Sequence, residues 1–171
     1  MTNKRIALIS TGGTIEKTYC ELHGVLDNQE SVLDVMLAGL RLGGVEVVRV
    51  PLLNKDSLEM DEGDYALISQ TALSMTEAHD GVVIVHGTDR LQVTGEHLVA
   101  QQPTPAAPIV FTGAMRPYML RNTDALQNLT EALIAVQLLD PGVYGVMHGK
   151  AVLFPGVVKD KDLSTFVRRD G

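Results

Sequence analysis

The chain has 171 residues, of which 45% are hydrophobic, so it carries enough apolar material for the core of one domain. Its formal net charge of −7 at pH 7 argues against a nucleic-acid groove or an anionic membrane surface as partner, and no apolar run approaches the roughly 20 residues that span a bilayer. A lone Cys20 forms no internal disulfide and the first residues lack a signal-peptide pattern, so a cytoplasmic protein is expected.

Five short apolar runs, rich in β-branched residues and bounded by turn residues, predict strands that are buried on both faces. Aromatic residues make up only 4% of the chain and Trp is absent, so the core is expected to consist of Val, Ile, Leu, Ala and Met. In chain order the runs are RIALIS (5–10), VEVVRV (45–50), GVVIVHG (81–87), PIVFTG (108–113) and VYGVMHG (143–149).

Four segments with helical spacing of apolar residues separate these runs. Asp61 is a candidate N-cap of the second helix, and Asp124 with Gln127 forms a variant capping box at the start of the fourth. Gly43 and Gly44 are expected to end the first helix. The predicted helices cover about 29–42, 62–78, 91–101 and 124–139, with Leu67 and Leu126 among the residues expected to face inward.

The alternation of strands and helices predicts a single α/β domain over residues 1–171, with no linker or internal repeat. Its expected architecture is a doubly wound, mostly parallel sheet with helices on both faces, a Rossmann-like arrangement of three layers. Ligands bind such sheets beyond the carboxyl ends of the strands. The loops that follow strands are therefore the candidate functional segments.

The sequence TGGT at residues 11–14 follows the first strand and allows three interpretations. It can be a plain glycine turn, or a phosphate cradle, although the chain lacks both G-x-G-x-x-G and G-x-x-x-x-G-K-[ST]. It can also be catalytic, because Gly12 and Gly13 leave room for a substrate carbonyl to approach the Thr14 hydroxyl.

The sequence HGTD at residues 86–89 also ends an apolar strand. Thr88 or Asp89 can cap the helix that begins near Leu91, and the same pair can face the crevice beside Thr14. His86 is a candidate base, but a histidine at the end of a buried strand is more often a hydrogen-bonded core residue, and we favour that role.

The later loops add further candidates. Arg116 is expected to secure its loop or a subunit contact, and Asp124 to cap the following helix. Lys159 follows the apolar GVV and can point inward, where partial desolvation suits a lysine to act as a base. The five His residues show no metal-ligand spacing, and Cys20 is interpreted as a bystander.

Taken together, the loops resemble the bacterial-type L-asparaginase family. The matching pieces occur in family order and cover nearly all of this chain, but they correspond only to the N-terminal domain of the usual two-domain members. They are TGGTIEKTY, DSLEM, VVIVHGTD, VFTGAMRP and, more loosely, GVVKDKDLSTF. The resemblance implies hydrolysis of asparagine to aspartate and ammonia, without a metal or organic cofactor.

The resemblance also implies a role for individual residues. Thr14 is the expected nucleophile, and Tyr19, in a flexible segment over residues 15–28, is the residue expected to orient and activate it. Thr88, Asp89 and Lys159 form the second catalytic group. The expected substrate-binding residues are Gly13, Ser57, Thr88, Asp89 and Ala114.

Departures from the family pattern keep alternatives open. Leu58 stands where members usually have a polar residue, and Arg90 stands where a small hydroxyl residue is common. The substrate can therefore be glutamine or another small amide, or the chain can be a non-catalytic amino-acid-binding module. Because family members borrow groups from a neighbouring subunit, a homo-oligomer built from dimers is expected; the alternative is that the sequence is a piece of a longer protein.

Overall fold

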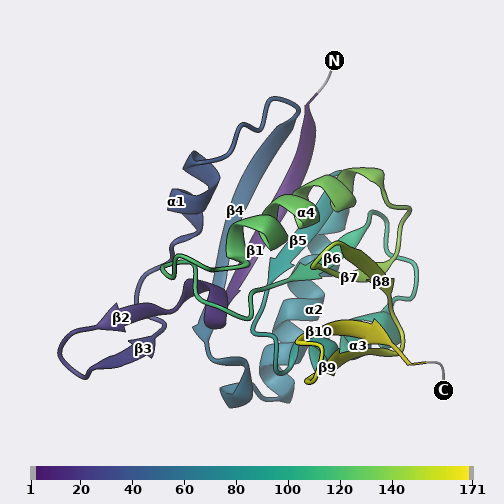
Figure 1. The fold of residues 1–171 in the computed structure, drawn as a ribbon. Helices are drawn as coiled ribbons and strands as arrows, with labels where there is room; N and C mark the ends of the chain where they lie inside the picture. Colours follow the sequence, from purple (N-terminus) through teal and green to yellow (C-terminus); the bar gives the residue numbers. More distant parts are fainter. Residues whose placement is uncertain (1–2, 170–171) are drawn as a thin grey trace.

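The computed structural model describes residues 3–169. Its main strands are β1 Lys4–Gly12, β4 Val45–Lys55, β5 Gly81–Val85, β6 Ile109–Thr112, β7 Val143–Met147 and β8 Lys150–Leu153. They form a six-stranded sheet in the order β4-β1-β5-β6-β7-β8 (Figure 1). Neighbouring strands from β4 to β7 are parallel, and β8 pairs antiparallel with β7 at one edge. The predicted doubly wound, mostly parallel sheet is confirmed.

Helices cover both faces of this sheet, as predicted. They are α1 Leu33–Ala38, α2 Glu62–Thr76, α3 Leu91–Gln101 and α4 Ala125–Leu138. In β1, Ile6 and Leu8 pack in the core beneath α1 and α4, whereas Ala7 and Ile9 pack in the core beneath α2 and α3. This alternation is what a strand covered on both faces requires. Over residues 3–169, none of the helices has the length and apolar character needed to cross a membrane.

Two hairpins outside the main sheet were not predicted. One joins β2 Thr18–Cys20 to β3 Val25–Asp27 and extends away from the sheet in Figure 1. The other joins β9 Val157–Asp160 to β10 Thr165–Arg168 and packs on the core beneath α2 and α3. The sequence pattern misses such short strands, because three or four residues show too little alternation to be told from a loop.

The first strand pair is longer than predicted. β4 continues past Val50 to Lys55, and its pairing with β1 shifts register between Ser10 and Gly12. Pro51 is tolerated because β4 is an edge strand. As a result the segment that we predicted as a loop starts only at Asp56, close to the end of β1.

The predicted helix ends are partly correct. Asp61 caps α2 through a capping box with Asp64, as expected for Asp61. The first helix is shorter than predicted at both ends. Before its start, the carbonyls of Asn28 and Gln29 accept hydrogen bonds from the Asn54 side-chain amide. At its end, Gly39 forms the C-cap. The predicted inward positions of Leu67 and Leu126 are wrong, because both side chains are exposed.

The cap predicted for the third helix is wrong, because α3 begins after Arg90 and neither Thr88 nor Asp89 caps it. Asp124 occupies the predicted N-cap position of α4, but its side chain makes no cap bond. The carboxylate accepts instead from the backbone N–H groups of Met115 and Arg116.

Two glycines close the turn between β1 and the short 3₁₀ helix η1, Thr14–Glu16. Gly12 and Gly13 have φ values of +99° and +84°, which favour glycine. A Cβ atom added at Gly13 would lie 2.5 Å from the Cα of Gly87. The backbone of the loop after β1 therefore touches the backbone of the loop after β5, and no side chain fits between them.

His86 is a buried titratable group at the end of β5. Its Nδ1–H donates to the Gly87 carbonyl at 2.9 Å, and its Nε2 accepts from the Thr94 hydroxyl of α3 at 2.8 Å. Both ring nitrogens are therefore satisfied in the neutral imidazole, in agreement with the favoured structural role. Burial lowers the pKa of His86 to about 4, against a smaller opposing effect of the Gly87 carbonyl.

We predict that Gly13→Ala destabilises the fold by about 2 kcal/mol or more, because the new methyl group meets the Gly87 backbone at an unfavourable φ. Urea denaturation measures the change. Gly43→Ala is the matched control, since a Cβ there has no neighbour within 4 Å. Equal stability of the two variants contradicts the close contact between the loops.

The low pKa of His86 also predicts a pH dependence of stability. The unfolded chain, with a histidine pKa of about 6.5, binds a proton that the folded chain binds only near pH 4. The stabilisation is complete above about pH 6.5 and is lost as the pH falls toward 4. Wild type should lose about 2 kcal/mol between about pH 7 and pH 5, and His86→Gln should lose clearly less. Parallel stability–pH curves from urea denaturation would contradict this assignment.

Candidate active site

Three loops meet at the carboxyl ends of β1, β4 and β5. Gly13 touches the Gly87 backbone, and a Cβ added at Gly87 would in turn lie 2.5 Å from Ser57 Oγ. Ser57 is buried and begins the short 3₁₀ helix η2, Ser57–Glu59, directly after β4. The structure thus brings the predicted residues Gly13 and Ser57 to one place from distant parts of the sequence.

Thr14 is the first residue of η1 and is partly exposed at this rim. Its side-chain hydroxyl has no hydrogen-bond partner among residues 3–169. The turn beneath it is held by backbone bonds, from Gly13 N–H to the Lys55 carbonyl at 3.0 Å and from Lys17 N–H to the Thr14 carbonyl at 3.1 Å. Thr14 therefore presents a free hydroxyl from a fixed backbone.

Thr88, Asp89 and Lys159 are in direct contact. The Lys159 amine, carried by β9, donates to Thr88 Oγ1 at 2.9 Å and to Asp89 Oδ1 at 2.7 Å. Thr88 is buried, the Lys159 side chain is 17% exposed and the Asp89 side chain is 46% exposed. The amine is thus held at the edge of the core, while the Asp89 side chain remains partly exposed and uses Oδ1 for its bond to the amine.

The loop after β6 lies against the same strand end. A Cβ added at Gly113 would lie 2.3 Å from the His86 carbonyl oxygen and 3.3 Å from Thr88 Cγ2. Ala114 is buried, and the N–H of Tyr118, further along the same loop, donates to the Ile15 carbonyl at 3.2 Å. The predicted residue Ala114 is therefore held beside the Thr88 loop.

Sequence reasoning missed the group that fixes this loop. Asp124 accepts hydrogen bonds from Met115 N–H and Arg116 N–H, both at 3.0 Å, and from His148 Nε2 at 2.7 Å. Burial alone raises the pKa of Asp124, but these bonds outweigh it and hold the pKa below its ordinary value. The buried Asn128 amide adds bonds to the Gly113 carbonyl and to Asp124. No sequence motif marks the pairing of His148 with Asp124, because the two residues lie far apart in the chain, His148 being in the turn between β7 and β8.

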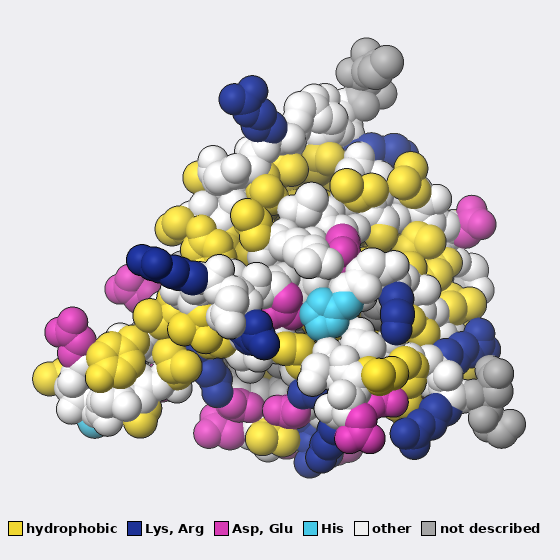
Figure 2. Space-filling model, viewed as in Figure 1, with side chains coloured by type: hydrophobic (Ala, Val, Ile, Leu, Met, Phe, Trp, Pro, Cys, Tyr) yellow, Lys and Arg dark blue, Asp and Glu magenta, His cyan; other side chains and the backbone are white. Residues whose placement is uncertain are grey.

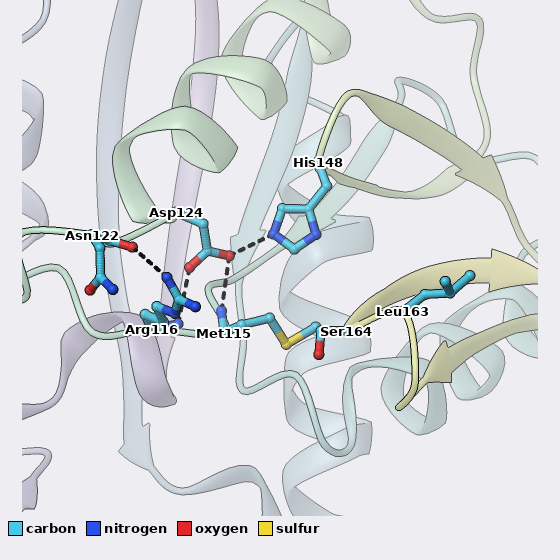
Figure 3. Close-up of a pocket in the computed structure, with 7 residues that line it drawn as sticks. All are labelled: Met115, Arg116, Asn122, Asp124, His148, Leu163 and Ser164. Carbon is cyan, nitrogen blue, oxygen red and sulfur yellow. Dashed lines mark hydrogen bonds and ion pairs between the residues drawn. The ribbon is translucent and has the colours of Figure 1, made fainter.

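The hollow beside this network has a volume of about 460 Å³. Figure 3 shows the His148 ring and the Asp124 carboxylate turned toward each other across its wall, and Figure 2 shows the same side of the molecule with a histidine ring near its middle. Arg116, in its lining, donates to the Asn122 carbonyl and so secures its own loop. The hollow is lined by Met115, Arg116, Asn122, Asp124, His148, Leu163 and Ser164. None of the predicted site residues lines it.

An ion pair ties the segment after η1 to the Ser57 loop. Lys17 Nζ lies 2.6 Å from Asp56 Oδ2, and Asp56 also caps η2 by accepting from Leu58 N–H. The bond from Lys17, with a smaller effect of the bond from Leu58 N–H, holds the pKa of Asp56 below its ordinary value. The base of the β2–β3 hairpin is thereby fastened to the site.

The structure does not bring Tyr19 to this group. Tyr19 lies on β2 with its side chain 54% exposed. The one atom that a Cβ added at Gly24 would meet within 4 Å is the Tyr19 hydroxyl oxygen, so the hydroxyl points toward the hairpin turn. Over residues 3–169, no cluster of three or more His, Cys, Asp or Glu side chains is arranged to hold a metal ion.

Comparison with known proteins identifies a family. Residues 5–165 match the family described as Asparaginase, N-terminal. The L-asparaginase of Thermococcus kodakarensis is 32% identical over 91% of this chain, and the match covers 47% of that protein. A glutamyl-tRNA(Gln) amidotransferase subunit of Methanobrevibacter smithii is 29% identical over 86% of this chain and is covered over 34% of its length. The chain thus spans about half or less of these curated relatives.

Solved structures give the same result. The thermostable L-asparaginase of T. kodakarensis superposes with a TM-score of 0.85 at 31% identity, over 96% of this chain and 51% of its own. A protein of Campylobacter jejuni described as a probable cytoplasmic L-asparaginase superposes with a TM-score of 0.75 at 28% identity, over 92% and 48% of the two chains. The family match and these similarities show that the chain belongs to the asparaginase family and that it matches the N-terminal domain of that family.

Proposed function

We propose that the protein hydrolyses L-asparagine to L-aspartate and ammonia, with Thr14 as the nucleophile. One observation carries the proposal. The Lys159 amine binds both Thr88 and Asp89, at the rim where the Thr14 turn packs on the Gly87 backbone. A hydroxyl, a second hydroxyl bound to an amine, and an open carboxylate are the groups that acyl transfer from an amino-acid amide needs.

In this proposal the substrate is held at its amino-acid end. The open oxygen of Asp89 pairs with the substrate ammonium, and Ser57 binds the α-carboxylate. Gly13 and Ala114 contribute backbone contacts to the amide. Because both ends of the substrate are fixed, its carboxamide carbon lies against the Thr14 hydroxyl, and the attack becomes an intramolecular step.

The chemistry then has two halves. Thr14 Oγ attacks the amide carbon, its proton leaves through the Thr88 hydroxyl and the Lys159 amine, and the intermediate oxyanion binds backbone N–H groups of the Gly12–Gly13 turn and Thr88. The C–N bond then breaks, the nitrogen takes up the proton, and ammonia leaves. Water cleaves the resulting ester by the same proton route and releases aspartate and the Thr14 hydroxyl.

We assign Tyr19 to a closed state of the β2–β3 hairpin. Exposed apolar side chains on the hairpin, among them Leu22 and Val25, support a movement that buries them over a bound ligand. Lys17 and its ion pair with Asp56 then act as the fixed base of the movement.

We also propose a single domain that works as a homo-oligomer built from dimers in the cytoplasm. The exposure of Asp89 and Thr14 supports an oligomer, because a second protein surface is needed to exclude water from the rim. The single cysteine and the similarity to the C. jejuni protein support the cytoplasm.

A second candidate function is supported by the similarity to the amidotransferase subunit of M. smithii. In that case the same site releases ammonia from glutamine, or from another small amide, for use by a partner protein. Leu58, exposed next to Ser57, keeps the substrate preference open, because it offers no hydrogen bond to a substrate.

Thr14→Ala should lower ammonia release from asparagine by about 10³-fold or more, because the nucleophile is removed. Release from asparagine and from glutamine is measured with purified protein. Thr71→Ala is the control and should keep wild-type activity, because the Thr71 hydroxyl lies on α2 and donates to the Leu67 carbonyl of the same helix. Preference for glutamine favours the second candidate. Binding without release from either amide favours a non-catalytic module and contradicts the proposal.

Lys159→Met should lower kcat by about 10²-fold or more while the protein remains folded, since the proton route is broken. Lys161→Met is the matched control, because Lys161 lies exposed in the turn of the same hairpin. Circular dichroism and urea denaturation check the fold of both variants. A Lys159 variant with a near-normal rate rules out the assigned role of the amine.

A further inference from the structure

Glu16 is a buried residue in the same 3₁₀ turn as the proposed nucleophile. It is the last residue of η1, two positions after Thr14, and is 2% exposed. Carboxylates are rarely buried without partners, because the charged form loses its hydration. The proposed mechanism does not use Glu16, so its position requires another explanation.

The neighbours of Glu16 come from two separate segments. Its own backbone N–H donates to the Gly13 carbonyl at 3.2 Å, and its carboxyl faces the Gly12 N–H, in the turn that carries Thr14, and the Ser31 hydroxyl, just before α1. Both groups are donors, so they favour the ionised carboxylate over the protonated acid.

A charged cluster lies at Ser31, beside the Glu16 carboxyl. Arg49 of β4 donates through Nη2 to the Ser31 hydroxyl oxygen at 3.2 Å and through Nε to Asp34 of α1 at 2.8 Å. Its Nη1 is buried and has no hydrogen-bond partner among residues 3–169. Arg49 favours the ionised form of Glu16, and Asp34 opposes it. The carboxyl therefore joins β1, α1 and β4 beneath one turn.

We propose that Glu16 is a positioning residue, whose ionised carboxylate holds the Gly12–Thr14 turn in the geometry that aims the Thr14 hydroxyl and whose protonation releases it. The coupling between Glu16 and the turn rests on the burial of Glu16 inside η1 and on its bond to Gly13. Its effect on turnover rests on the function proposed for Thr14.

The surroundings of the Glu16 carboxyl raise the pH at which it takes up its proton above the range of an ordinary glutamate. Burial, the largest effect, raises the pKa of Glu16, and Ser31, Arg49 and Gly12 only partly oppose it. As the pH falls from neutral, the carboxyl is therefore protonated earlier than an exposed glutamate. The active form is the ionised one, so activity declines on the acid side as Glu16 takes up its proton.

A purely structural glutamate would add stability without linking its proton to the turn, and NMR separates the two cases. We expect the backbone ¹H–¹⁵N signals of Gly12, Gly13 and Thr14 to shift together with pH, with a midpoint above that of an exposed glutamate. The shift should vanish in Glu16→Gln, remain in the exposed control Glu30→Gln, and move to higher pH in Ser31→Ala, which lacks one donor. Signals that do not titrate in wild type, or that titrate equally in Glu16→Gln, overturn the proposal; if Glu16→Gln does not fold, the midpoint in Ser31→Ala decides.

Kinetics then test the link to turnover. Glu16→Gln should lower kcat for asparagine by about tenfold or more at neutral pH with KM nearly unchanged, and should remove the acid limb of kcat. Glu16→Asp, which keeps the carboxylate, should recover part of the rate. An unchanged acid limb in Glu16→Gln overturns the link. If wild type hydrolyses no amide while the NMR titration is present, the proposed function fails and the coupling stands.

Discussion

The structure depends on a direct contact between backbones at one end of the sheet. The turn at Gly13 lies against Gly87, and Gly87 lies against Ser57, with no space for a side chain at either glycine. Parallel strands bring their carboxyl ends to a common edge, but the strands alone would leave the loops apart. Because the glycines let three loops close on one another, short side chains such as those of Thr14 and Thr88 lie at one rim of the sheet, where we propose that the substrate binds.

Two further layers of polar bonds support this contact. The ion pair between Lys17 and Asp56 connects the first loop to the second. The Asp124 carboxylate, with Asn128 and His148 behind it, fixes the loop that carries Ala114. These groups do not touch the proposed ligand position, yet each holds the backbone that does. A site assembled from loops needs such support, because loops have few packing contacts of their own.

Much of the fold and part of the site could be predicted from the sequence. Runs such as GVVIV in β5 are apolar throughout, as strands covered on both faces must be, and HGTD follows at the carboxyl end of the strand, the edge at which sheets of this kind bind ligands. The pattern was insufficient where tertiary contacts decide. Asp124 is a residue type that commonly caps helices, but its carboxylate binds the backbone of a loop nine residues earlier in the chain. The orientation of the Tyr19 side chain is set by the β2–β3 hairpin, whose strands are too short to be predicted from the sequence. The role of Glu16 was invisible because its partners, Ser31 and Arg49, lie in other elements.

Lys159 reaches the site on a ribbon that is separate from the main sheet. Over residues 3–169, β9 pairs only with β10, and Lys159 stands opposite Phe166, whose buried ring packs in the core. The place of the amine therefore depends on the register of this ribbon and on its packing against the core, not on the pairing of the main sheet. A one-residue slip of β9 against β10 would turn the amine to the opposite face of the ribbon without breaking a strand pair of the main sheet. The register of one short hairpin thus decides whether the Lys159 amine meets Thr88 and Asp89.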